Sequence, residues 1–200
     1  ASLRYLKSRG LDSNDLWKFK FCVSSESRFF RRVIMPSFDS EGSLNYYVSR
    51  SLDESKFKYI NAKIDKTKII FNEINIDWSQ ELTITEGPFD LTKCNKNSTC
   101  LLGSEISEAS LLFQKIVINK TPVLLALDSD MPEKSQYFAR MFSQYDIHVR
   151  CLTLGRFKDV GEMSSEEFEK ARQQSYVWNR NDLIRTRIST VLSKSCSNLV

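Results

Sequence analysis

The feature that most constrains the fold is an alternation of short apolar runs with longer amphipathic segments from residue 81 onward. The runs ELTIT (81–85), TCLLG (99–103), TPVLLALD (121–128) and DIHVRCLTL (146–154) have the length and composition of buried strands. Helices are predicted between them, at 87–94, where Pro88 suits a first turn, and at 104–115 and 132–145. This alternation predicts an α/β domain: a parallel sheet with helices on both faces.

The residues before and after this region follow different patterns. Residues 1–79 predict a mixed α+β lobe, with two short helices within 2–19, two strands around the turn at 41–43, and a polar hinge at 63–80. Residues 164–200 predict a helical tail of two helices, 164–178 and 181–194, capped by Ser165 and Asp182 and packed on the core. The domain prediction is therefore 1–79, 80–163 and 164–200.

Composition excludes several classes of protein. No apolar run approaches 18 residues and the N-terminus lacks an apolar signal region, so no membrane segment or secretory signal is expected. The five cysteines are widely spaced and His148 is the only histidine, which argues against a zinc site or a disulfide framework. Free thiols and a cytoplasmic location are predicted. Because the chain begins with Ala rather than Met, a fragment or a processed chain is expected.

Charge is unevenly distributed along the chain. Residues 1–70 hold 14 Lys and Arg against 8 Asp and Glu, whereas residues 71–200 hold 15 against 17. A basic front half and a locally acidic back half indicate a polyanion-binding surface beside a metal-binding one.

Acidic residues follow the predicted strands where each strand ends. In an open parallel sheet these ends share one edge, so the side chains should converge. The set comprises Glu86, Asp90, Asp128, Asp130 and Asp159, with Glu162 close by. Taken singly, such residues more often cap helices or face water. Together they would repel one another unless a cation intervened, and a set of oxygen ligands selects Mg²⁺ or Mn²⁺.

Three of these segments resemble the signature segments of the TOPRIM domain. They are Glu86-Gly-Pro-Phe-Asp90, Asp128-Ser-Asp130 and Lys158-Asp159. TOPRIM is a metal-binding α/β unit shared by topoisomerases, DnaG-type primases and some nucleases. The resemblance implies that Glu86, Asp128 and Asp130 are catalytic metal ligands, with Asp90 and Asp159 as further ligands.

The front half is similar to the N-terminal lobe of the RNA polymerase domain in DnaG-type primases. The similar segments are YLKSRG, RRVIMP, the strand ending in Arg50, and KYIN. The residues that this resemblance implies for nucleotide or template binding are Arg32, Arg50, Lys58, Asn61 and Lys158. The elements EGPFD and KDVGEM are most similar to primases of tailed phages. One departure is Gly161, which stands where bacterial primases usually place a second Asp.

The resemblance implies the catalytic core of a DNA primase. Such an enzyme would make short RNA primers from NTPs on single-stranded DNA, using Mg²⁺ or Mn²⁺, and would hold an RNA–DNA hybrid. A replicative helicase and a zinc-binding domain would lie outside this chain. Two alternatives stay open: a TOPRIM nuclease or other phosphotransferase, and a TOPRIM module that binds nucleic acid without chemistry. The chain is short for a topoisomerase, which needs further domains.

Overall fold

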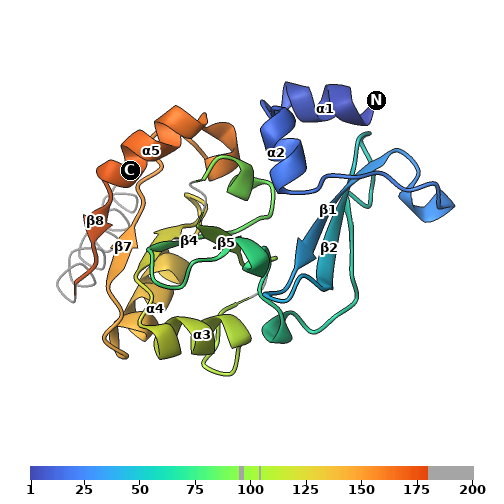
Figure 1. The fold of residues 1–200 in the computed structure, drawn as a ribbon. Coiled ribbons are helices and arrows are strands. Elements are labelled where there is room, and N and C mark those ends of the chain that lie inside the picture. The colour runs from blue at the N-terminus through green and yellow to red at the C-terminus, as the bar shows by residue number, and fades with distance from the viewer. Residues whose placement is uncertain (95–96, 104, 180–200) are drawn as a thin grey trace, which may run out of the picture.

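The computed structural model describes residues 1–94, 97–103 and 105–179 and contains two sheets (Figure 1). The first sheet is antiparallel in the order β1-β2-β3, with strands β1 (Arg32–Phe38), β2 (Leu44–Ser51) and β3 (Tyr59–Asn61). At the β1–β2 turn, Asp39 Oδ1 accepts the N–H groups of Glu41 and Ser43. Gly42 takes a positive φ of 85°, which a side chain would strain. The predicted hairpin of the front lobe is therefore present.

The second sheet has five strands in the order β5-β4-β6-β7-β8. Its strands are β4 (Leu82–Thr85), β5 (Ser98–Cys100), β6 (Val123–Ala126), β7 (Val149–Cys151) and β8 (Tyr176–Val177). The first four strands of the sheet order run parallel, and β8 pairs antiparallel with β7. The centre is formed by β4 and β6, which pair from Leu82 with Val123 to Thr85 with Ala126. Both central strands are fully buried, as their apolar runs predict.

Helices cover both faces of this sheet. Helices α3 (Leu111–Asn119) and α4 (Pro132–Ser143) pack against one face, in a cluster that includes Leu125. Helix α5 (Ser165–Gln173) packs on the other face, where Phe168 shares a cluster with Leu124. Consecutive residues of a strand point to opposite faces, so Leu124 and Leu125 pack against the helices on the two opposite faces of the sheet. The predicted α/β class is confirmed.

The two lobes share a continuous core. Helices α1 (Ser2–Ser8) and α2 (Ser13–Lys18) lie over the front sheet (Figure 1), and Asp12 caps α2 in a reciprocal capping box. The residues of one cluster come from both lobes: Phe19, Met35, Tyr46, Val48, Phe71, Leu91, Cys100 and Leu102. Within the predicted hinge at 63–80, Phe71 is 1% exposed and the Asn72 side chain donates to the Ser98 carbonyl. The connection between lobes is therefore packed against both of them, and a hinge motion there stays a prediction.

Several predicted helices are shorter in the structure. Residues 87–94 form only a 3₁₀ turn, Asp90–Thr92, and the Asp90 carboxylate accepts a hydrogen bond from the Gly87 N–H. Helix α3 begins at Leu111, where the Ser110 side chain caps it. The tail helix α5, capped by Ser164, ends at Gln173, and Tyr176–Val177 join the sheet as β8. The second predicted tail helix, 181–194, and its Asp182 cap lie outside the described residues.

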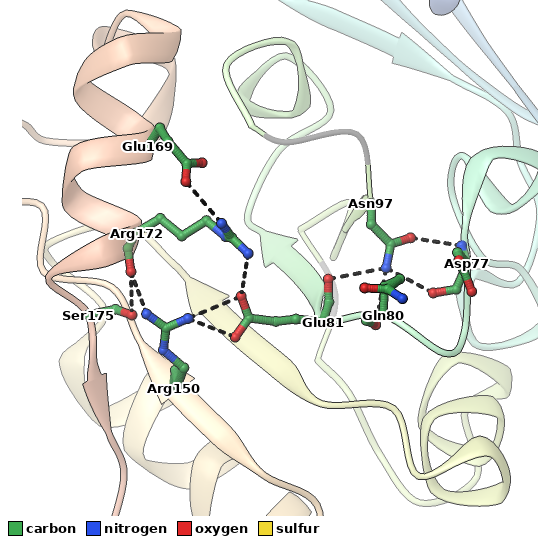
Figure 2. Close-up of polar contacts among 8 residues, drawn as sticks. All are labelled: Asp77, Gln80, Glu81, Asn97, Arg150, Glu169, Arg172 and Ser175. Carbon is green, nitrogen blue, oxygen red and sulfur yellow. Dashed lines mark hydrogen bonds and ion pairs between the residues drawn. The ribbon is translucent and has the colours of Figure 1, made fainter.

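An ion-pair network ties the amino-terminal edge of the sheet to α5, away from the strand ends that carry the acidic set (Figure 2). Glu81 precedes β4 and pairs with Arg150 at 3.0 Å and with Arg172 at 3.2 Å. Arg172 also pairs with Glu169. On the other side of Glu81, the Asn97 side chain donates to the carbonyl groups of Asp77, Gln80 and Glu81 and so fixes the start of β4.

Replacing Glu81 with alanine is expected to lower the free energy of unfolding by about 2–3 kcal/mol. The reason is that Glu81 is 15% exposed in its side chain and is shared by two half-buried arginines, which would lose their counter-charge. Urea unfolding followed by circular dichroism measures the change. Glu54→Ala removes an exposed carboxylate and should change stability by less than about 0.5 kcal/mol. Equal effects of the two substitutions would contradict this role for Glu81.

Two predictions from composition can be compared with the described residues. None of the helices in residues 1–94, 97–103 and 105–179 has the length and apolar character that crossing a bilayer demands. Cys22, Cys94 and Cys100 are free thiols, and Cys100 and Cys151 are buried in the core. Cys196 lies outside the described residues.

Candidate active site

A cavity of about 410 Å³ lies where the two lobes meet, at the carboxyl ends of β4 and β6. Both lobes line it. The front lobe contributes Arg9, Val48, Arg50, Lys58, Tyr59 and Asn61, and the second lobe contributes Glu86, Gly87, Pro88, Phe89, Asp90, Leu102, Gly103, Asp128 and Asp159. One wall is acidic and the other is basic, so the cavity can take a ligand that carries both phosphates and a bound cation.

Loop contacts bring the acidic wall together. The Ser129 N–H donates to the Lys158 carbonyl at 2.9 Å, which joins the loop after β6 to the loop after β7. A Cβ placed on Gly161 would lie 2.8 Å from Asp90 Oδ1 and 3.2 Å from Asp159 Oδ1. The two carboxylates therefore fill the space that a side chain at position 161 would need. This gives a structural reason for the glycine at position 161, where bacterial primases usually have an aspartate.

Burial and mutual repulsion raise the pKa of two carboxyl groups in this wall. Burial raises the pKa of Asp90 to about 7, with the charges of Asp159 and Asp128 adding to the effect and the Gly87 N–H opposing it. The pKa of Asp128 rises to about 6, again mainly through burial and then through nearby negative charge, of which Asp159 contributes most. The wall is thus electrostatically strained, and a cation would relieve that strain.

Glu86 already has a positive partner. Its Oε1 lies 2.6 Å from Lys134 Nζ, whereas its Oε2 is buried without a hydrogen-bond partner. Among the described residues, no three His, Cys, Asp or Glu side chains are arranged to hold a metal ion. The donors nevertheless fit a hard divalent cation, because they are all oxygens, one of them is buried and unsatisfied, and two carboxyl groups have raised pKa values.

The basic wall is built around Arg50. Its Nη1 donates to Tyr59 Oη at 2.7 Å, and its guanidinium lies 5.4 Å from the Tyr59 ring centre and 5.0 Å from that of Phe89. Such contacts hold the planar group in place while leaving it able to donate to phosphate oxygens. Arg9, at the end of α1, and Lys58, just before β3, add positive charge on the same side.

The fold matches that of solved primase structures. The structure of the zinc-binding and RNA polymerase domains of Aquifex aeolicus primase aligns with a TM-score of 0.74 and 20% identity over 96% of this chain. A DnaG primase catalytic domain bound to ssDNA aligns with a TM-score of 0.70 and 16% identity over 88% of this chain. The chain has the fold of a DnaG-type primase catalytic core.

Sequence comparison with curated proteins agrees with this primase-core fold. A DNA primase of Thermotoga maritima is 25% identical over 216 residues, covering 82% of this chain. The chain spans 37% of the length of that primase, and 59% of the Aquifex aeolicus chain. No protein-family model matches the sequence.

The primase-core fold gathers most of the predicted site residues around one cavity. The residues that line it are Glu86, Asp90, Asp128, Asp159, Arg50, Lys58 and Asn61. Asp130 lines an adjoining cavity and adds to the negative charge at Asp128, while Lys158 is exposed and opposes that charge. Glu162 accepts the Lys158 N–H and so closes its own loop.

Arg32 is placed differently from the prediction. It is 7% exposed and does not line the cavity. Its Nη2 donates to the Phe57 carbonyl at 2.6 Å, and its Nη1 is 3.4 Å from the Lys58 carbonyl. Arg32 is therefore buried in β1, and its hydrogen bonds hold in place the segment that carries Lys58. In this structure Arg32 faces backbone carbonyls and not the cavity, and its contact with nucleotide or template stays a prediction.

Two residues of the site were not among the predictions. Arg9 lines the cavity, and the YLKSRG similarity contained the clue, because that segment includes the arginine just before its final glycine. Lys134 could not be inferred from any motif, because its role depends on the position of α4 beside Glu86.

Replacing Arg50 with alanine is expected to weaken nucleotide or template binding about ten-fold and to reduce the salt dependence of template binding by about one counterion. The loss follows from removal of a pre-positioned guanidinium on the basic wall. Fluorescence anisotropy with labelled single-stranded DNA at several salt concentrations measures it. Mn²⁺ affinity should be unchanged, and Arg28→Ala, an exposed arginine, is the control. A salt slope equal to that of the unmodified chain would contradict this role.

Proposed function

We propose that the chain is the catalytic core of a DNA primase, an enzyme that synthesises short RNA primers from NTPs on single-stranded DNA. The observation that carries the proposal is the cavity at the lobe junction. It combines four carboxylates with Arg9, Arg50 and Lys58 in a primase-core fold.

The acidic wall would hold the divalent cations. Glu86, Asp128 and Asp130 are the proposed catalytic ligands, with Asp90 and Asp159 supporting them. Bound Mg²⁺ or Mn²⁺ would supply Lewis-acid activation of the primer 3′-hydroxyl and would neutralise the triphosphate. The reaction forms a phosphodiester bond and releases pyrophosphate.

The basic wall would position the nucleic acid and the triphosphate. Arg50 is held by aromatic rings, so it keeps its orientation without a ligand. Lys58 and Arg9 would neutralise phosphate charge, and the Asn61 amide can accept or donate hydrogen bonds to nucleotide groups. The exposed Lys158 lies at the acidic side and could contact an incoming phosphate from there.

The partners of the chain are also proposals. One structural relative is described as bound to ssDNA and another as containing a zinc-binding domain. We infer that this chain binds template and RNA–DNA hybrid, and that a zinc-binding domain and a replicative helicase act with it in the cytoplasm. We also infer that residues 80–163 form a TOPRIM unit. Its three acidic segments and KDVGEM support closeness to primases of tailed phages.

The test is a synthesis assay with single-stranded template, four NTPs and Mg²⁺ or Mn²⁺. Short RNA products are expected. Hydrolysis of DNA without synthesis would support a TOPRIM nuclease instead. DNA binding that Asp128→Ala leaves intact, with no reaction under any condition, would support a non-catalytic module.

A further inference from the structure

Lys134 forms an ion pair inside the candidate site. It stands in the first turn of α4, four residues after Asp130, and reaches across to the end of β4. Its Nζ lies 2.6 Å from Glu86 Oε1, and the two side chains are 19% and 17% exposed. An ammonium this far from water requires a counter-charge, and Glu86 supplies it.

The pairing satisfies only one side of the Glu86 carboxylate. Oε2 is buried and has no hydrogen-bond partner. An ionised carboxylate offers about four lone-pair sites, so a buried one held through a single oxygen is poorly satisfied. Lys134 therefore supplies charge to Glu86 without supplying the contacts that a metal ion and its waters would give.

We propose that Lys134 is a built-in counter-cation that occupies Glu86 until a divalent ion displaces it. This inference rests on the proposed function, in which Glu86 is a metal ligand. An ammonium at 2.6 Å from Oε1 and a divalent ion on the same carboxylate would repel each other strongly at such short range. Cation binding and the Lys134–Glu86 pair are therefore in competition.

The structure provides a place for the displaced ammonium. Lys134 also borders a second cavity, of about 600 Å³, whose lining includes Glu105 and Glu133, two acidic residues outside the proposed metal ligands. The four-carbon stem of lysine can move its charge into that cavity by changing rotamers. The pair thus keeps Glu86 neutralised while the site is empty, and it lowers the affinity of the empty site for divalent ions.

The test measures Mn²⁺ affinity of the full chain directly, by titration followed through the electron paramagnetic resonance signal of free Mn²⁺. Lys134→Met should tighten Mn²⁺ binding about ten-fold, because it removes a positive charge beside the ligand. Arg140→Met removes one positive charge from the exposed face of the same helix and should change affinity by less than about two-fold. Lys134→Gln, which keeps an N–H donor near Glu86, should also tighten binding.

Two further readouts separate competition from a structural role. In EDTA, Lys134→Met should melt at a lower temperature than the unmodified chain. Adding Mn²⁺ should remove this difference in melting temperature. Adding Glu86→Gln to Lys134→Met should abolish the gain in affinity. Unchanged or weaker Mn²⁺ binding in both Lys134 variants, with binding retained in the unmodified chain, would overturn the inference and leave the proposed function intact. Absence of Mn²⁺ binding in every protein would overturn the metal site, and both proposals with it.

Discussion

Replacing Asp128 with alanine is expected to reduce primer synthesis about 1,000-fold, which corresponds to about 4 kcal/mol of transition-state stabilisation. Asp128 lines the cavity two residues after β6, and its pKa is raised by burial and then by the charges of Asp159, Glu86 and Asp130. Removing it would take a proposed ligand from the centre of the acidic wall. Initial rates of RNA synthesis at saturating template and NTP measure the loss.

The same substitution should leave the fold intact. Asp128 is charged, partly buried and among like charges, so its loss should be neutral or mildly stabilising when metal is absent. Asp53→Ala, which breaks an exposed ion pair with Arg31, is the control and should retain full activity. A large fall in melting temperature for Asp128→Ala in EDTA would show that lost activity reflects unfolding, and would contradict this account of the site.

The second large effect concerns stability and pH. Asp90 has a pKa of about 7 in the folded chain, against 3.8 ordinarily. Between these values the folded state binds more protons than the unfolded state, so in EDTA the free energy of unfolding should fall as pH rises from about 4 to about 7. Asp128, with a pKa of about 6, adds a fall in the same direction.

Asp90→Asn should remove most of this pH dependence. The asparagine Oδ1 can still accept the Gly87 N–H, while the buried charge is gone. At pH 8 in EDTA we expect stabilisation by about 2 kcal/mol, less than the full shift implies because the side chain is partly exposed, and a melting temperature raised by about 5 °C. At pH 4 the two proteins should melt together. Asp53→Asn, whose carboxyl has a lowered pKa beside Arg31, should show no gain at pH 8. A difference that is the same at both pH values would contradict the assignment.

Much of the fold could be predicted because the local sequence pattern of most elements indicates their secondary structure. Strands β4 and β6 are buried on both faces, so they appear as uninterrupted apolar runs. The errors arose where tertiary contacts override propensity. Tyr176 and Val177 continue a helical pattern in sequence, yet pairing with Arg150 and Cys151 makes them a strand. Residues 63–80 look like a polar linker, although Ile70 and Phe71 are each 1% exposed.

The candidate site was predictable where a motif placed a residue at the end of a strand. Glu86 and Asp128 follow directly from that rule. Arg32 shows a limit of prediction from motifs. A motif position fixes the residue type, but it does not fix whether the side chain faces a ligand or backbone carbonyls. Lys134 shows a second limit, because no local sequence pattern relates it to Glu86, which is 48 residues away.

The most direct test of the central claim is extension of an RNA primer already annealed to single-stranded DNA, with Mn²⁺ and one NTP at a time. Primer annealing removes the need for initiation, so the catalytic core alone should suffice. The account predicts addition of the nucleotide complementary to the next template base, and its loss in Asp128→Ala. Addition regardless of template, cleavage of the nucleic acid, or no addition despite tight binding of template and Mn²⁺ would contradict the assignment as a primase core.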